Sequence, residues 1–322
     1  MVIMGVSHEN DDEQQRNVLD ANLELKTLAK VELREDDETR AHALATMREW
    51  IAKHPDIINC RTDAPFLLRF LRTKKFSILQ AQEMLERYLI IREIYPNWFR
   101  QLDVLDSTIS DILDNGYLVP LLERDEFGRC VIFSNAGRFD PYKHTAADMA
   151  RVHSLVVESL MDDAENQIRG YSYVNDESGL LMGHITMWSL TDIRNMTRCI
   201  QYSTPMRHKS THLINIPPYA TKVFEFVNSL LSDKLKNRLM FHSNIEELHN
   251  SINPKILPKE YGGEVPLADM ISELKKKLLA KREQLLALDD MKINVNKKGK
   301  ILSDFNDNQT GLEGSFRKLE VD

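Results

Sequence analysis

Apolar residues in the N-terminal third of the chain recur every three or four positions, which is the spacing of amphipathic helices. The pattern starts at residues 23–31, after a polar segment at 1–20 that we expect to be a disordered leader. Asp63, and Ser77 with Gln80 in a capping-box pattern, stand where helices should begin. The predicted helices cover residues 41–52, 66–72 and 78–94. The sequence therefore predicts an all-helical N-terminal module over residues 21–100.

Between residues 101 and 265, short apolar runs bounded by Gly, Asn and Asp alternate with helical periods. The predicted strands cover residues 117–122, 129–134, 171–175, 184–188 and 210–215, and the predicted helices cover 146–168, 192–202 and 217–231. Strands that alternate with helices form an α/β layer fold. We therefore expect a mixed, partly parallel sheet that is covered by helices.

The helix predicted at 217–231 carries an unusual amount of apolar surface. Pro217 and Pro218 end the preceding strand, because proline lacks an amide hydrogen for the sheet and favours the first turn of a helix. Its broad apolar face consists of Tyr219, Val223, Phe224, Phe226, Val227, Leu230 and Leu231. A second short helix with basic residues is predicted at 232–239. Apolar surface and positive charge are thus adjacent, and the first helix needs an apolar partner.

The segment after residue 265 begins with a further helical period, at 266–288. Its apolar positions include Leu267, Met270, Ile271, Leu274, Leu278 and Leu285, and several lysines lie beside them. Such a helix either packs on the body of the protein with its lysines in water, or touches a membrane with its apolar face. The polar segment 289–322 predicts a flexible tail.

Charge and cysteine content narrow the class of protein. The chain has 322 residues and a net charge of −7, which argues against general nucleic-acid binding, because that function needs a basic surface. Cys60, Cys130 and Cys199 are widely spaced, which is typical of a reducing compartment. We find no secretory signal, no lipid-attachment motif and no apolar run near the ~20 residues of a membrane span. We expect a cytoplasmic protein that meets membranes reversibly.

Motifs of catalysis and metal binding are missing or fragmentary. No nucleophile elbow, phosphate-binding loop or dinucleotide-binding glycine motif occurs. The neighbouring pairs Asp162–Asp163 and Glu246–Glu247 cannot face each other on a helix. His208 and His212 have the spacing of a helical metal pair, but on a predicted strand they lie about 13 Å apart. We therefore expect no enzymatic activity and no metal site.

Three motifs in order along the chain resemble the signature of the CRAL-TRIO lipid-binding family. They are His212-Leu-Ile-Asn-Ile-Pro-Pro218, Lys234-x-x-x-Arg238-x-x-x-His242 and Leu257-Pro-x-Glu-Tyr-Gly-Gly263. Residues 63–76 resemble the family's N-terminal helical module, so the resemblance covers about residues 40–265. It implies a CRAL-TRIO domain over residues 101–265, in which the helix at 217–231 is a mobile gate over a lipid cavity.

The resemblance also implies which residues line that cavity. They are His153, Val157, Tyr171, Tyr173, Trp188, Met196, Cys199, Ile200, Val223, Phe226, Val227 and Leu230. A filled hydrophobic core would explain the apolar members of this set equally well. His153 and Asn175 are polar where related carriers have apolar or small residues, so the ligand stays open among retinoid, tocopherol and phospholipid classes.

In family members that respond to phosphoinositides, basic residues hold the anionic head group. Carried over to this chain, the head-group positions are Lys74, Arg207, Lys209, Lys234 and Arg238. If these side chains converge, they form a charge-assisted phosphate site; the alternative is a set of scattered surface charges.

These expectations together indicate a cytoplasmic, monomeric lipid-binding and transfer protein. Its only cofactor would be the bound hydrophobic lipid, and its other partner a phosphoinositide-containing membrane, endosomal or similar, that it meets reversibly. An alternative is a lipid-gated adaptor without net transfer activity. A third hypothesis, an α/β enzyme that acts on a lipid, lacks a nucleophile with a matching base.

Overall fold

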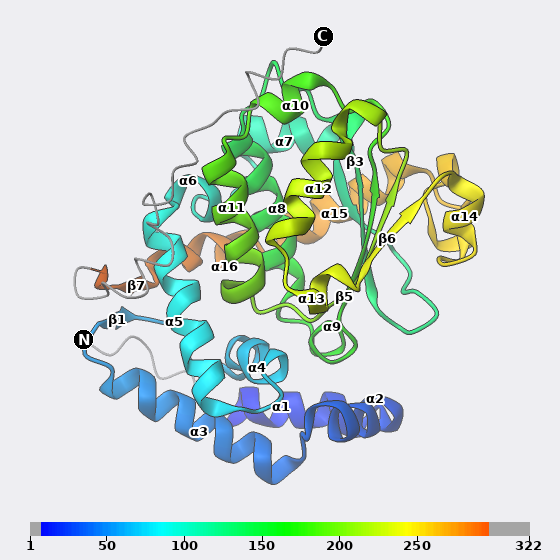
Figure 1. The fold of residues 1–322 in the computed structure, drawn as a ribbon. Helices are drawn as coiled ribbons and strands as arrows, with labels where there is room; N and C mark the ends of the chain where they lie inside the picture. Colours follow the sequence, from blue (N-terminus) through cyan, green and yellow to red (C-terminus); the bar gives the residue numbers. More distant parts are fainter. Residues whose placement is uncertain (1–7, 296–322) are drawn as a thin grey trace.

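The computed structural model describes residues 8–295. Its N-terminal part, residues 8–114, is almost entirely helical, and the helices of residues 8–73 lie below the rest of the molecule in Figure 1. The helices are α1 (His8–Asp20), α2 (Leu23–Leu28), the π-helical turn η1 (Ala29–Leu33), α3 (Asp37–Lys53), α4 (Ala64–Thr73), α5 (Ile78–Ile94), α6 (Pro96–Phe99) and α7 (Ser107–Asp114). The Asp63 carboxylate accepts a hydrogen bond from Phe66 N at 3.1 Å, as predicted for an N-cap. Ser77 makes no such bond, so the predicted capping box is wrong, and α5 is held by its buried side chains instead.

Residues 8–20 form helix α1, so the prediction of a disordered leader is wrong for this part of it. Leu19 is fully buried, and the Asp12 carboxylate pairs with Arg48 of α3 at 2.7 and 2.8 Å. A mostly polar helix of this kind is too weak to be recognised from local periodicity, because tertiary contacts supply most of its stability.

Five strands form the main sheet, in the order β2-β3-β4-β5-β6. They are β2 (Leu118–Pro120), β3 (Cys130–Asn135), β4 (Tyr171–Asp176), β5 (His208–Ile214) and β6 (Leu239–His242). β2 runs antiparallel to β3, and the other three pairs are parallel. The mixed sheet covered by helices is therefore confirmed.

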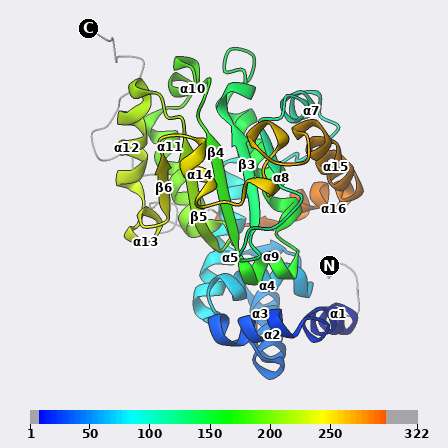
Figure 2. The ribbon, with the colours of Figure 1, turned by 90° about the vertical axis from the view of Figure 1, so that its right-hand side faces the viewer.

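Helices cover both faces of the sheet (Figures 1 and 2). One face is covered by α8 (Ala146–Leu160), α11 (Leu190–Arg198) and α12 (Thr221–Leu230), together with the π-helical turn η3 (Cys199–Ser203). The opposite face is covered by α14 (Ile245–His249) and by the turns η5 (Pro254–Ile256) and η6 (Lys259–Tyr261). The ring of Tyr261 lies 4.7 Å from that of Phe133 on this second face.

Two predicted elements of this domain differ in the structure. Residues 182–186 form helix α10 (Met182–Thr186), whereas the sequence predicts a strand at 184–188. The His184 ring stabilises this helical turn, because it accepts a hydrogen bond from Leu181 N and forms another with the carbonyl oxygen of Phe139. The predicted helix at 146–168 is two helices, α8 and α9 (Ala164–Arg169), because Asp163 caps a new helix through Asn166 N at 2.8 Å.

Buried ion pairs join the helical module to the α/β layer. Arg69 of α4 is buried and donates to Glu158 and Asp162, each at 2.7 Å. Tyr88 of α5 donates to the same Glu158 carboxylate, also at 2.7 Å. Separating the partners of a buried ion pair would leave uncompensated charges in the interior. These pairs therefore fix the helical module to the α/β layer.

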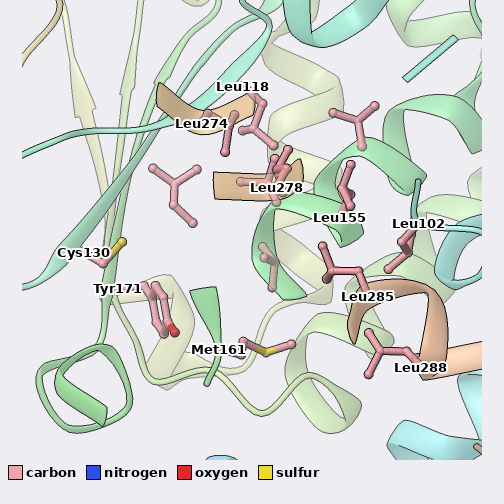
Figure 3. Packing of buried hydrophobic residues seen from close by; sticks show 14 of the residues in the cluster. Leu102, Leu118, Cys130, Leu155, Met161, Tyr171, Leu274, Leu278, Leu285 and Leu288 are labelled. Carbon is pink, nitrogen blue, oxygen red and sulfur yellow. The ribbon is translucent and has the colours of Figure 1, made fainter. Parts of the chain in front are cut away.

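The C-terminal segment packs on the body of the protein. Helices α15 (Leu267–Ala280) and α16 (Arg282–Leu286) bury Leu274, Leu278 and Leu285 against β2 and α8 (Figure 3). This favours the packed interpretation of the predicted amphipathic helix. The turn η7 (Ala287–Asp290) and β7 (Lys292–Ile293) follow, and β7 pairs with β1 (Ile57–Asn59). The predicted flexible tail is thus wrong for 289–295, where Met291 and Ile293 are buried; the rest of that prediction lies outside the described residues.

Candidate lipid site and anion site

Helix α12 and the 3-10 turn before it, η4 (Pro218–Ala220), occupy the position of the predicted gate. The helix has a strongly apolar face, yet none of its residues is fully buried. Single side chains hold its two ends. The Gln201 amide donates to Leu230 O at 3.1 Å and accepts from Ser232 N at 2.8 Å, and the Tyr219 hydroxyl donates to Leu180 O.

The predicted lining residues fall into three groups. Val157, Tyr171 and Cys199 are buried, and Val157 and Tyr171 belong to the main core. Ile200 is 53% exposed. The remaining residues are half-buried, namely His153, Tyr173, Trp188, Met196, Val223, Phe226, Val227 and Leu230. The ring centroid of Trp188 lies 6.1 Å from that of Trp98 of α6, so Trp188 faces the helical module.

Two half-buried histidines on this side of the sheet behave electrostatically as interior groups. Burial lowers the pKa of His153 to about 4, and its ring lies 5.7 Å from that of Tyr117. Burial and the Arg238 guanidinium lower the pKa of His208 to about 4. His208 also stacks on Tyr173 at 5.3 Å. Burial disfavours the charged form of an imidazole, so both rings are neutral at pH 7.

Glu177 is a polar residue of this region that sequence reasoning missed. It follows β4 directly, and Asp176 before it bonds Asn135 and Tyr261 on the α14 side. The alternation of strand side chains places Tyr173 and Asn175 on the α12 side, and Glu177 lies at the carboxyl end of the same strand. Burial and then Asp176 raise the pKa of Glu177 to about 7. Its position after a strand end, where α/β sheets bind ligands, is the only sequence signal that could have found it.

We expect the histidine shifts to make the fold less stable in acid. A histidine with a folded pKa of about 4 takes up protons only in the unfolded state between pH 6.5 and 4. Stability is therefore present at neutral pH and is lost as the pH falls. Between pH 7 and pH 4.5, the free energy of unfolding measured with urea should fall by about 1–3 kcal/mol less in His153→Gln than in wild type. Exposed His42→Gln is the control, and an unchanged pH slope in His153→Gln would contradict the assignment.

The five predicted anion-site residues lie in or directly beside α4, β5 and α13 (Asp233–Lys236), and their charges influence one another. Burial and the Lys234 ammonium lower the pKa of Lys74. The pKa of Lys234 is lowered by burial and by three cations, which are Arg238, Lys75 and Arg207. Burial and Arg207 lower the pKa of Lys209. Crowded like charges of this kind favour an anion.

The structure adds three residues to this cluster. The Lys75 ammonium lowers the pKa of Lys234. The Arg129 guanidinium lowers the pKa of Lys209 and of Arg238. Glu32 of η1 is an anion within the cluster, paired with Arg207 and Lys209. Lys75 follows Lys74 directly in the sequence, whereas Arg129 and Glu32 could not be placed here from local sequence, because they lie on distant segments. Below, "anion-site cluster" means Lys74, Lys75, Arg129, Arg207, Lys209, Lys234 and Arg238.

The two histidines considered as a metal pair lie on opposite faces of β5. His208 bonds the Thr211 hydroxyl at 2.7 Å, whereas His212 bonds Ser210 at 3.2 Å and His242 at 3.0 Å. Within residues 8–295, no three His, Cys, Asp or Glu side chains converge as a metal site would require. None of the helices in this range is long and apolar enough to cross a membrane. A separate groove of about 660 Å³ lies between α7 and α15, away from these residues.

Comparisons with known proteins agree with this architecture. A family model for the CRAL/TRIO domain matches residues 114–263, and a model for a Pinta-like UBA domain matches residues 36–109. Clavesin-1 of Xenopus laevis is 32% identical over 255 residues, which cover 78% of this chain and 77% of that protein. Human clavesin-2 is 31% identical over 255 residues, with 78% of each chain covered. The crystal structure of Sfh5 shares the fold, with a TM-score of 0.51 and 11% identity over 78% of this chain and 99% of that chain.

The mixed sheet with helices on both faces places the chain in the class of α/β domains with the CRAL-TRIO fold. The chain belongs to the CRAL-TRIO family of lipid-binding and lipid-transfer proteins. The clavesins are among its relatives.

Proposed function

We propose that this protein encloses a small hydrophobic ligand between its sheet and α12, and exchanges it at phosphoinositide-containing membranes. The observation that carries the proposal is α12, an apolar helix of which no residue is fully buried. Each Å² of apolar surface that stays in contact with water raises the free energy of the folded protein by about 25 cal/mol. The apolar face of α12 therefore needs an apolar partner. A lipid in the closed state, and a membrane in the open state, would each supply one.

The proposed ligand class follows from half-buried polar groups on α8 and on β4 and its carboxyl end. Burial lowers the pKa of His153 to about 4 and raises the pKa of Tyr173, and burial with Asp176 raises the pKa of Glu177 to about 7. Such groups favour a lipid that carries a neutral hydrogen-bonding group, because a charged head would have to be desolvated next to them. The protein would act as a cytoplasmic monomer that binds endosomal or similar membranes reversibly.

Native mass spectrometry of the purified protein, followed by extraction and identification of bound lipid, tests the first half of the proposal. Transfer of that lipid between donor and acceptor vesicles tests the second half. A protein that binds lipid but does not transfer it would instead be a lipid-gated adaptor. A preparation that neither contains nor takes up lipid would contradict the proposal.

The hydrogen bonds at the end of α12 lead to a further prediction. Gln201→Ala removes both bonds between η3 and the α12 terminus, each of which stabilises the closed position by about 1 kcal/mol. We expect lipid exchange measured by vesicle transfer to become about thirtyfold faster. Gln14→Ala, at an exposed position on α1, is the matched control. An unchanged rate for Gln201→Ala would mean that this end of α12 does not limit exchange.

A further inference from the structure

The anion-site cluster already contains a carboxylate. Glu32 Oε2 accepts a hydrogen bond from Lys209 Nζ at 3.0 Å and another from the Arg207 guanidinium. Glu32 lies 175 residues from Arg207 in the sequence, on the turn η1 of the N-terminal module. Two of the cations assigned to a lipid phosphate are therefore occupied by a residue of the same chain.

The bond pattern shows that this carboxylate is held as an anion. Burial opposes ionisation, but the hydrogen bonds from Arg207 and Lys209 outweigh it and lower the pKa of Glu32. A carboxylate and a phosphate offer the same kind of acceptor oxygen to guanidinium and ammonium groups. By contrast, Lys74 and Lys234 form no ion pair within residues 8–295, so part of the cluster stays available to an external anion.

The segment that carries Glu32 is attached separately from the main core. We call residues 23–33, that is α2 and η1, the latch segment. Its buried side chains, Leu25, Ala29 and Leu33, form a small cluster of their own with Leu19 and Ile168. Apart from that cluster, it is held to the α/β layer by surface ion pairs, Glu32 with Arg207 and Lys209, and Glu24 with Arg169 at 3.0 Å.

The chain is anchored on both sides of the latch segment, and the backbone at its C-terminal end has the conformation of a hinge. Arg34, which follows it, has a φ of 64°, a left-handed conformation that breaks the helix. The next residue, Glu35, is buried and paired with Arg72 at 2.7 Å, so the chain beyond the hinge is anchored to α4. Before the latch segment, α1 is anchored through Asp12 and Arg48. Both neighbours of the latch segment are thus anchored, and lifting the segment would separate its buried side chains from Leu19 and Ile168.

We propose that Glu32 occupies the place of a membrane phosphate, and that an anionic head group displaces the latch segment when the protein docks. The inference rests on the proposed function, because it needs the anion-site cluster to bind lipid head groups. Lys74 and Lys234 would make the first contact with the membrane. Arg207 and Lys209 would exchange the Glu32 carboxylate for phosphate oxygens, which would release η1 from β5.

The test compares wild type with Glu32→Gln, which keeps the shape of the side chain and removes its charge. Binding is measured by co-sedimentation with phosphatidylcholine vesicles that contain a phosphatidylinositol bisphosphate, and with phosphatidylcholine vesicles alone. Freeing two cations at an anionic surface should raise affinity for the first vesicles about thirtyfold. Glu38→Gln, an exposed position on α3, is the matched control and should bind like wild type.

Hydrogen exchange supplies a second measurement that a change of surface charge alone would not move. In wild type, amides of residues 23–33 should exchange faster when the bisphosphate vesicles are added, while those of α4 and α5 stay protected. A soluble inositol phosphate should reproduce the change if the phosphate alone releases the latch segment. If only vesicles do so, the membrane surface is also needed.

The outcomes separate the latch from the docking function. If wild type binds the bisphosphate vesicles and Glu32→Gln binds equally, with exchange of residues 23–33 unchanged, the latch proposal is overturned and docking stands. If neither protein binds these vesicles, docking is overturned and the latch with it. Tighter binding of Glu32→Gln to phosphatidylcholine alone would also count against the latch, because it would indicate loosened structure rather than a vacated phosphate position.

Discussion

Removing four positive charges from the anion-site cluster is expected to weaken binding to phosphoinositide-containing vesicles by at least about a hundredfold. The four changes are Lys74→Ala, Lys209→Ala, Lys234→Ala and Arg238→Ala. Each basic residue near an anionic surface contributes about 1 kcal/mol, and every 1.4 kcal/mol is a factor of ten. The four residues lie in or directly beside α4, β5 and α13, and their charges act on one another, so their effects should add at a single site.

Vesicle co-sedimentation at several salt concentrations measures this effect. Wild-type binding should fall as salt rises, because charge attraction at a membrane surface is screened over a Debye length of about 8–10 Å. A matched variant removes four exposed lysines elsewhere, Lys53, Lys143, Lys276 and Lys292, and changes the net charge equally. Equal loss of binding in both variants would show that net charge rather than the cluster is responsible.

Placing two carboxylates on the inner side of α12 is expected to slow vesicle-to-vesicle lipid transfer by about a hundredfold. The changes are Phe226→Asp and Leu230→Asp, at two half-buried positions one turn apart. Each apolar side chain gains about 1.5–3 kcal/mol when it is buried, and a carboxylate loses that gain both against a lipid in the closed state and against a membrane in the open state.

The matched variant carries Thr221→Asp and Ser229→Asp, at exposed positions of the same helix. It adds the same charge but leaves the apolar face intact, so it should transfer lipid at close to the wild-type rate. Circular dichroism and thermal unfolding show whether both variants keep the fold. Wild-type transfer by a folded Phe226→Asp, Leu230→Asp protein would show that α12 is ordinary packing and no gate.

Local sequence patterns determined the order and type of most elements. The three-to-four-residue apolar period predicts α5 at residues 78–94, and the structure has Ile78–Ile94. Pro217 and Pro218 predict the end of β5 and the start of the next helix, and β5 ends at Ile214. These features depend on residues a few positions apart, so the chain carries them before it folds.

Elements without a strong period of their own were set by tertiary contacts. Helix α1 depends on Leu19 and on the Asp12–Arg48 pair, and β7 exists only because it meets β1. Residues 184–188 have a strand-like composition, but the α10 turn lies beyond the end of β4, where no strand is available to pair with them. In each case the deciding partner is distant in sequence.

The same division applies to the candidate site. The sequence, through its family resemblance, supplied Lys74, Arg207, Lys209, Lys234 and Arg238 as cations, but a charge pattern contains no distances. The parallel pairing of β5 with β4 and β6, and the packing of α4 below them, brought these cations together. Glu32 shows the limit most clearly, because its ion pairs span 175 and 177 residues and form only when η1 is folded against β5. Composition and periodicity thus determined which residues could bind an anion, whereas the tertiary structure decided which anion they hold, because Coulomb attraction depends on separation in space.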